Sequence, residues 1–183
     1  MVIFLAGLPG SGKTAIAETV AAATGACHLD LDEFKRAIAP ALDPDYLTNL
    51  DRGIPLQDAV RARLFRMVAE LLIPVARCVR YLIVTEVLHQ DSTRKILLDA
   101  LRESPGGCLL VQVIADDQIV IDRLGLPRAR HLLKDPIQMR ANFSLIFEEM
   151  PERDFVLENN GSLEGASAKL IAFIHAAEQK LGR

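Results

Sequence analysis

The residues best suited to chemistry lie near the start of the chain, in the stretch Gly7-Leu8-Pro9-Gly10-Ser11-Gly12-Lys13-Thr14. Their spacing matches G-x-x-x-x-G-K-[ST], the pattern of a loop that binds phosphate. Its glycines let backbone amides surround phosphate oxygens, Lys13 can reach the β- and γ-phosphates, and the Thr14 hydroxyl can ligate Mg²⁺. We therefore predict that every residue of this stretch contributes to binding the phosphates of a nucleotide.

Three carboxylates are the next candidates. Asp30 and Asp32 follow a short apolar segment at residues 26–29, and Glu86 directly follows another at residues 81–85. A carboxylate beside an acceptor hydroxyl can take its proton, and Asp32 or Glu86 could be that base. Glu86 could instead bind Mg²⁺ through water, bind the acceptor, or be a solvated strand end. Asp32 could instead only cap a helix.

Basic residues form a third group, Arg123, Arg128, Arg130 and His131. Arginines can neutralise the charge of a phosphoryl group in transfer, and a basic segment that closes over ATP would exclude water. Arg123 could instead interact only with a helix dipole. Weaker candidates remain open: arginines for an anionic acceptor group, a histidine, and a turn near the adenine. These are Arg52, Arg61, Arg63, His89, Lys134, Arg140 and Asn159–Gly161.

Alternating strands and helices must position these groups. Compact apolar runs predict strands at residues 2–6, 26–29, 81–85, 108–114 and 154–157. Helical periodicity and capping signals predict helices at about residues 15–23, 56–79, 92–103, 137–149 and 163–181. A further helix should begin at residue 30, and a short one capped by residues 116–117 should end at about residue 124. We expect Pro40 and Pro44 to break the second helix, residues 40–55 to form a loop, and Pro74 to kink or shorten the next helix.

This alternation predicts a parallel sheet with helices on both faces. Ligands of such sheets bind beyond the carboxyl ends of the strands. The phosphate-binding loop, Asp30, Asp32 and Glu86 should therefore surround one crevice.

Composition narrows the class of protein. The chain has 183 residues and a net charge of −3, which suits one domain and disfavours strong non-specific binding to nucleic acid. Its three cysteines form no C-x-x-C pattern, so we expect small core residues in a reducing compartment. No signal peptide or membrane-length apolar run is evident. We expect a cytoplasmic protein, a monomer or homodimer, that does not bind membranes.

Several motifs together resemble small P-loop metabolite kinases of the shikimate/gluconate kinase type. Residues 28–33 resemble the Asp-x-Asp motif of that family, residues 53–58 its Gly-x-Pro-Leu-x-Asp stretch, and residues 142–151 the helix that follows its lid. The resemblance implies a three-layer α/β/α sandwich whose five-stranded parallel sheet has the order 2-3-1-4-5. It also implies one P-loop kinase domain over residues 1–183, with a lid at about 124–137.

The resemblance also implies roles. ATP and Mg²⁺ would be the cofactors, with Thr14 and Asp30 at the metal and Asp32 near the acceptor hydroxyl. The catalytic candidates are then Lys13, Asp32, Glu86, Arg123 and Arg130. After the third strand, residues 85–89 differ from the family pattern, so the acceptor stays unnamed.

We therefore predict an ATP-dependent kinase that phosphorylates a hydroxyl of a small molecule. The alternatives are a polynucleotide or nucleoside kinase, an antibiotic phosphotransferase of the same fold, and a regulatory ATPase or GTPase. The sequence holds no Asn-Lys-x-Asp motif for guanine.

Overall fold

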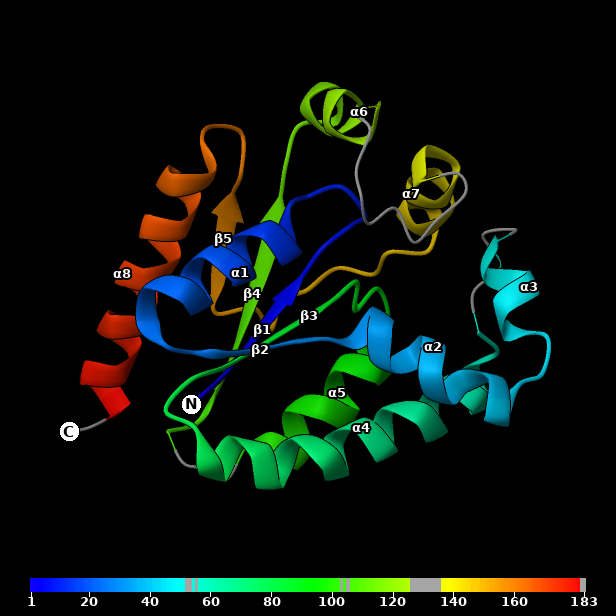
Figure 1. The fold of residues 1–183 in the computed structure, drawn as a ribbon, viewed down its shortest axis with the longest axis horizontal. Coiled ribbons are helices and arrows are strands. Elements are labelled where there is room, and N and C mark those ends of the chain that lie inside the picture. Colours follow the sequence, from blue (N-terminus) through cyan, green and yellow to red (C-terminus); the bar gives the residue numbers. More distant parts are fainter. Residues whose placement is uncertain (52–53, 55, 103, 105, 126–135, 182–183) are drawn as a thin grey trace.

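A five-stranded parallel sheet forms the centre of the molecule (Figure 1). The computed structural model describes residues 1–51, 54, 56–102, 104, 106–125 and 136–181. The sheet order is β2-β3-β1-β4-β5, which confirms the expected order. The strands are β1 (Val2–Ala6), β2 (Cys27–Asp30), β3 (Leu82–Glu86), β4 (Cys108–Ile114) and β5 (Phe155–Glu158).

The central strand β1 is buried on both faces because its side chains alternate between two separate cores. Val2, Phe4 and Ala6 belong to one core, while Ile3 and Leu5 belong to the other. These two cores hold the helices of the two outer layers. The predicted three-layer sandwich is thereby confirmed.

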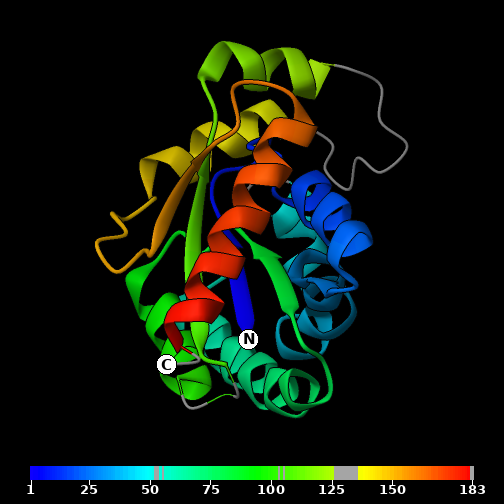
Figure 2. The same cartoon turned by 90° about the vertical axis from the view of Figure 1, so that its left-hand side faces the viewer.

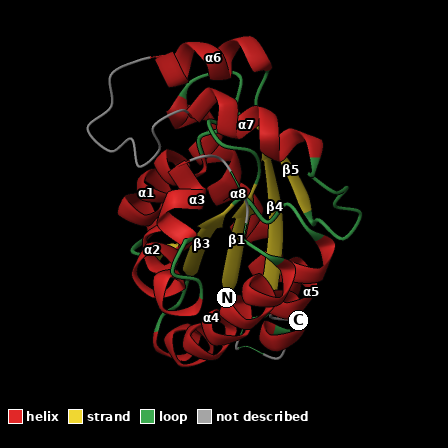
Figure 3. Ribbon diagram, turned by 90° about the vertical axis from the view of Figure 1, so that its right-hand side faces the viewer, coloured by secondary structure: helices red, strands yellow, loops and turns green. Residues whose placement is uncertain are grey.

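Helices cover both faces of the sheet. On one face lie α1 (Lys13–Thr24) and α8 (Leu163–Leu181), and on the other α4 (Asp58–Cys78) and α5 (Asp91–Leu101). Figure 2 shows α8 running along the sheet, and Figure 3 shows the strands enclosed by helices. The remaining helices are α2 (Leu31–Leu42), α3 (Tyr46–Asp51), α6 (Asp117–Gly125) and α7 (Pro136–Leu145).

Three expectations about helix ends were wrong. α2 continues through Pro40 to Leu42, because the proline lies in the last turn, where the missing amide costs one hydrogen bond of a helix that is ending. α3 lies inside the stretch that we expected to be a loop. α4 contains Pro74 and ends at Cys78, one residue before the expected end. α7 ends at Leu145, four residues before the expected end.

The cysteines also differ from expectation. Cys27 and Cys108 are half-buried and pack against a core, whereas Cys78 is exposed, so none is fully buried. Within the described ranges, no helix combines the length and the apolar character that crossing a membrane requires.

Candidate functional site

The phosphate-binding loop, residues 7–14, is held tightly between β1 and the neighbouring strands. Gly7 and Gly12 have φ of +150° and +95°. A Cβ atom at Gly7 would lie 2.2 Å from the Val113 carbonyl oxygen, and one at Gly12 would lie 2.3 Å from Asn159 Nδ2. Both positions therefore require glycine, for backbone conformation and for space.

Lys13 closes this loop on itself. Its Nζ donates to the carbonyl oxygens of Gly7 (2.7 Å) and Leu8 (3.1 Å). Burial lowers the pKa of Lys13 to about 8, although Asp32 and Glu86 attract the charged form. The amine thus lies among weak acceptors, which phosphate oxygens can replace with stronger, charged ones.

Thr14 and Asp30 form a pair of oxygen ligands beside the loop. Thr14 Oγ1 donates to Asp30 Oδ2 at 3.3 Å. Burial, together with the charge of Asp32, raises the pKa of Asp30. A hydroxyl and a carboxylate are hard oxygen ligands of the kind that Mg²⁺ takes. No group of three His, Cys, Asp or Glu side chains in the described part of the chain could hold a metal alone, so the pair suits an ion shared with phosphates.

Asp30 also caps α2, because its Oδ1 accepts from the Asp32 amide at 2.9 Å. The capping alternative for Asp32 was therefore wrong. The carboxylate of Asp32 is free of that task, and its side chain is 51% exposed.

Lys35 joins the two candidate bases. Its Nζ lies 2.7 Å from Asp32 Oδ1 and 2.6 Å from Glu86 Oε2. The Glu86 side chain is only 4% exposed, so it is no solvated strand end, and its Oε1 accepts from the Val87 amide at 2.8 Å.

The two carboxylates differ in acidity. Burial raises the pKa of Glu86 even though Lys35 opposes it. Burial also acts on Asp32, but there the combined attraction of Lys35, Lys13 and Arg36 outweighs it and the pKa is lowered. Sequence reasoning missed Lys35, although its position three residues after Asp32 on a helix was a signal.

Lys35 and Glu86 also line a cavity. It encloses about 540 Å³ of empty space, counting the part open to solvent. We call it the acceptor pocket. Its apolar lining comes from α3, α4, the connection between them, α7 and the segment after β3. It consists of Tyr46, Ile54, Leu56, Phe65, Leu88, Met139 and Phe143. Its polar lining consists of Lys35, Arg61, Glu86, His89 and Thr93.

Arg61 forms its hydrogen bonds with neighbouring groups of the protein. Its guanidinium donates to Asp58 Oδ1 at 3.1 Å and also to Gln90 Oε1 and the Leu56 carbonyl. Arg63, by contrast, is exposed on α4 and lies outside the pocket lining.

Two other arginines contact the loop region. Arg123 Nη2 donates to the Asn159 carbonyl at 2.9 Å, and Asn159 Nδ2 donates to the Ser11 carbonyl at 2.8 Å. From α7, Arg140 Nη1 donates to the Pro9 carbonyl at 3.0 Å. Arg140, left open from the sequence, thus contacts the loop directly. The positions of Arg52, Arg128, Arg130, His131 and Lys134 lie outside the described residues.

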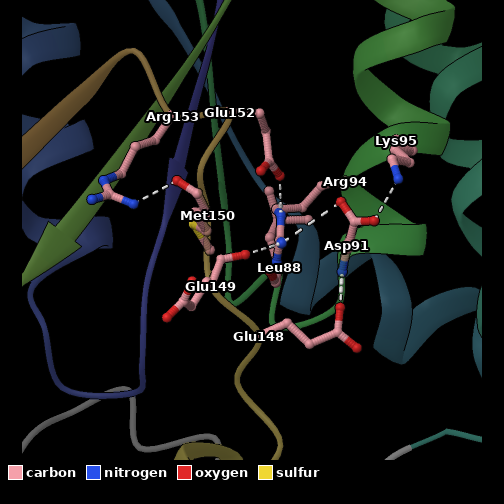
Figure 4. A network of polar contacts seen from close by, with 9 residues as sticks. All are labelled: Leu88, Asp91, Arg94, Lys95, Glu148, Glu149, Met150, Glu152 and Arg153. Atoms are coloured by element: carbon pink, nitrogen blue, oxygen red, sulfur yellow. Dashed lines mark hydrogen bonds and ion pairs between the residues drawn. The ribbon is translucent and has the colours of Figure 1, made fainter.

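A buried arginine on α5 fixes the segment that carries Glu86 and His89 (Figure 4). Arg94 is 0% exposed. It donates to the Leu88 carbonyl at 3.0 Å and the Glu149 carbonyl at 2.5 Å, and it pairs with Glu152. Leu88 has a φ of +50°, a conformation that such contacts must stabilise. Arg94 therefore ties the end of β3 to the chain after α7.

Comparisons with known proteins bear on the family and the fold of the chain. The sequence model of a family described as AAA domain matches residues 2–132. No curated protein matches the chain. At these identities the following likenesses establish the fold. A sugar kinase from Janibacter sp. HTCC2649 superposes with a TM-score of 0.76 at 23% identity, covering 97% of this chain and 96% of that one.

Two further structures have the same fold. A gluconokinase from Sinorhizobium meliloti 1021 gives a TM-score of 0.74 at 21% identity and covers 98% of this chain and 94% of its own. The Mycobacterium tuberculosis APS kinase CysC, in complex with AMPPNP and APS, gives a TM-score of 0.68 at 17% identity. This match covers 95% of this chain and 96% of that one. The fold that the sequence motifs implied is confirmed.

Proposed function

Because the chain belongs to the AAA domain family of P-loop proteins, we propose that it is an ATP-dependent kinase that phosphorylates a hydroxyl of a small molecule. One observation carries this proposal. Lys35 and Glu86 of the Asp32–Lys35–Glu86 network line the pocket, and Asp32 and Glu86 also act electrostatically on Lys13 of the phosphate-binding loop. A switch protein needs the loop, but it has no use for a carboxylate network leading into a pocket.

The loop residues 7–14 form the donor half of the proposed site. Backbone amides and Lys13 would hold the phosphates of ATP. Thr14 and Asp30 would hold Mg²⁺, which neutralises phosphate charge when bound. Arg123 and Arg140, both near the loop, would add positive charge close to the phosphates.

Asp32 is the base in this proposal. The acceptor oxygen forms its bond to Pγ while the bond from Pγ to the β,γ-bridging oxygen breaks, and that electron pair leaves with ADP. The hydroxyl proton passes to Asp32, whose half-exposed carboxylate is available to a substrate. Glu86 has a different role in this proposal. The Val87 amide holds one of its carboxylate oxygens, and the other pairs with Lys35 and so positions that ammonium.

The proposal treats residues 1–183 as one kinase domain with a lid at about 124–137. Arg130 would act from that lid on the transferring phosphoryl group. A polynucleotide kinase, an antibiotic phosphotransferase and a regulatory ATPase remain the alternatives that the experiment must separate.

A coupled assay of ADP release tests the proposal. Sugars, sugar acids, nucleosides, aminoglycosides, apolar alcohols and short oligonucleotides are screened as acceptors with ATP and Mg²⁺. We expect at least one class to raise ADP release above background. Lys13→Ala should then lower kcat by about 10²-fold or more, whereas Lys169→Ala, on the exposed side of α8, should not. Stimulation by partner proteins alone would favour the regulatory ATPase.

A further inference from the structure

His89 lines the acceptor pocket, and one of its ring nitrogens has no hydrogen-bond partner among the described residues. This nitrogen is Nε2, and the residue is 7% exposed. Buried polar atoms in folded proteins nearly always have a partner. Because His89 lines the cavity, a molecule bound there can supply the missing partner.

The two cations that line the pocket, Lys35 and Arg61, are already paired. Lys35 bridges Asp32 and Glu86, and Arg61 is bound by Asp58 and by the Leu56 carbonyl. Both cations therefore have carboxylate partners within the protein before any acceptor binds. The charges of this site thus position one another rather than a charged ligand.

His89 is also fixed in place. Its carbonyl accepts from the Glu148 amide at 2.8 Å, and Arg94 holds the carbonyl of the preceding Leu88. Its ring packs edge-on against Phe143 of α7, with centroids 4.9 Å apart. The imidazole therefore cannot readily turn away to find water.

The imidazole is neutral at physiological pH. Burial, with the positive charges of Arg61 and Lys35, lowers the pKa of His89 to about 4. A neutral ring presents Nε2 as donor or acceptor, according to its tautomer. Its natural partner is an uncharged hydroxyl, carbonyl or amide.

We propose that His89 Nε2 anchors the acceptor, and that the acceptor is a compact alcohol with an apolar body and a second, uncharged polar group. This inference rests on the proposed function and narrows it. Tyr46, Phe65, Met139 and Phe143 would surround the apolar body. A sugar acid would place most of its hydroxyls against these side chains without partners, and its carboxylate would face cations that are already paired.

Matched probes test this proposal on the full-length protein. We compare trans-1,2-cyclohexanediol, cyclohexanol and D-gluconate as acceptors, with ADP release and the phosphate ester as readouts. One neutral hydrogen bond should give the diol a kcat/KM about tenfold above that of cyclohexanol. D-gluconate should be the poorest of the three.

Variants of His89 assign the preference. His89→Phe keeps an aromatic ring against Phe143 and should reduce the diol preference to about one. His89→Gln retains a polar group and should therefore keep part of the preference for the diol over cyclohexanol that His89→Phe loses. His175→Gln, on the exposed side of α8, should change nothing. If His89 had only a structural role, its substitution would lower kcat/KM equally for the diol and for cyclohexanol. That result would overturn the proposal.

A binding measurement separates this inference from the proposed function. The His89 imidazole NMR signals, assigned by their loss in His89→Phe, should shift with the diol and not with cyclohexanol. If no acceptor raises ADP release, the kinase proposal fails and these signals still decide the inference. If D-gluconate is the best acceptor, the kinase proposal stands and the inference fails.

Discussion

Lys35 places a positive charge between two carboxylates that differ in exposure and in acidity. Asp32 is half-exposed with a lowered pKa, while Glu86 is buried with a raised one. The same ammonium thus keeps Asp32 ionised, as a base requires, and satisfies the buried Glu86. In this arrangement Asp32 is the base, Lys35 keeps it ionised, and Glu86 holds Lys35 in place.

Substitution distinguishes the two carboxylates. Asp32→Asn should lower kcat by about 10²–10⁴-fold, because it removes the proton acceptor. Its melting temperature should fall by about 4 °C or less, since an exposed ion pair contributes little and Asp30 supplies the cap. Steady-state kinetics and calorimetry measure both effects. Near-normal turnover in Asp32→Asn, with a large loss in Glu86→Gln, would assign the base to Glu86.

The pKa of Lys13 predicts how ATP binding depends on pH. With its pKa lowered to about 8, Lys13 loses its charge as the pH rises through that value. ATP phosphates favour the charged form, so binding should take up a proton near pH 8. Affinity should fall roughly tenfold for each pH unit above the pKa. Calorimetry in two buffers of different ionisation enthalpy measures the uptake, and Lys13→Met should show none.

At the scale of elements, Arg94 joins β3, α5 and the chain after α7 through one buried side chain. Arg94→Met should lower the free energy of unfolding by about 3 kcal/mol or more, because Glu152 and two carbonyl groups lose their partner. Urea titration measures this loss. Arg102→Met provides the control, since that side chain is 78% exposed. Equal effects of the two variants would refute a structural role for Arg94.

Local patterns predicted most elements but few contacts between them. The apolar run of residues 2–6 and the glycine spacing after it fixed β1 and the loop correctly, because both depend on neighbours in the chain. Arg94 was not singled out, because its partners Glu149 and Glu152 lie 55 and 58 residues away in sequence. The role of Arg140 was left open, because its partner Pro9 lies 131 residues away. Pro40 misled the prediction, because the cost of a proline depends on how close the helix end lies.

The site shows the same limit. Thr14 and Asp30 were assigned to one place from motif and strand position, and they lie in contact. The pairing of Lys35 with Glu86 depends on how α2 crosses the end of β3, which no local pattern encodes. The cavity beside His89 likewise arises only when α3, α4 and α7 come together.

At the scale of the whole molecule, ligand binding should stabilise the fold. ATP with Mg²⁺ at 100 times its Kd adds about 2.7 kcal/mol, which raises the melting temperature by about 5–11 °C for a chain of this size. Differential scanning fluorimetry measures the shift. Thr14→Val should remove the increment that Mg²⁺ adds and keep the increment from ATP alone. A Mg²⁺ increment unchanged in Thr14→Val would argue against this residue as a ligand.

The alternation of β1 between two cores bears on how such a protein can evolve. Ile3 and Leu5 pack with α1, which begins at Lys13, whereas Phe4 packs with Phe65 and Leu88, which also line the acceptor pocket. Mutations that reshape the pocket therefore fall in a different core from those that support the loop. A lineage can drift toward new acceptors while its capacity to use ATP stays intact, and a mutant library confined to α3, α4 and α7 should sample the same freedom.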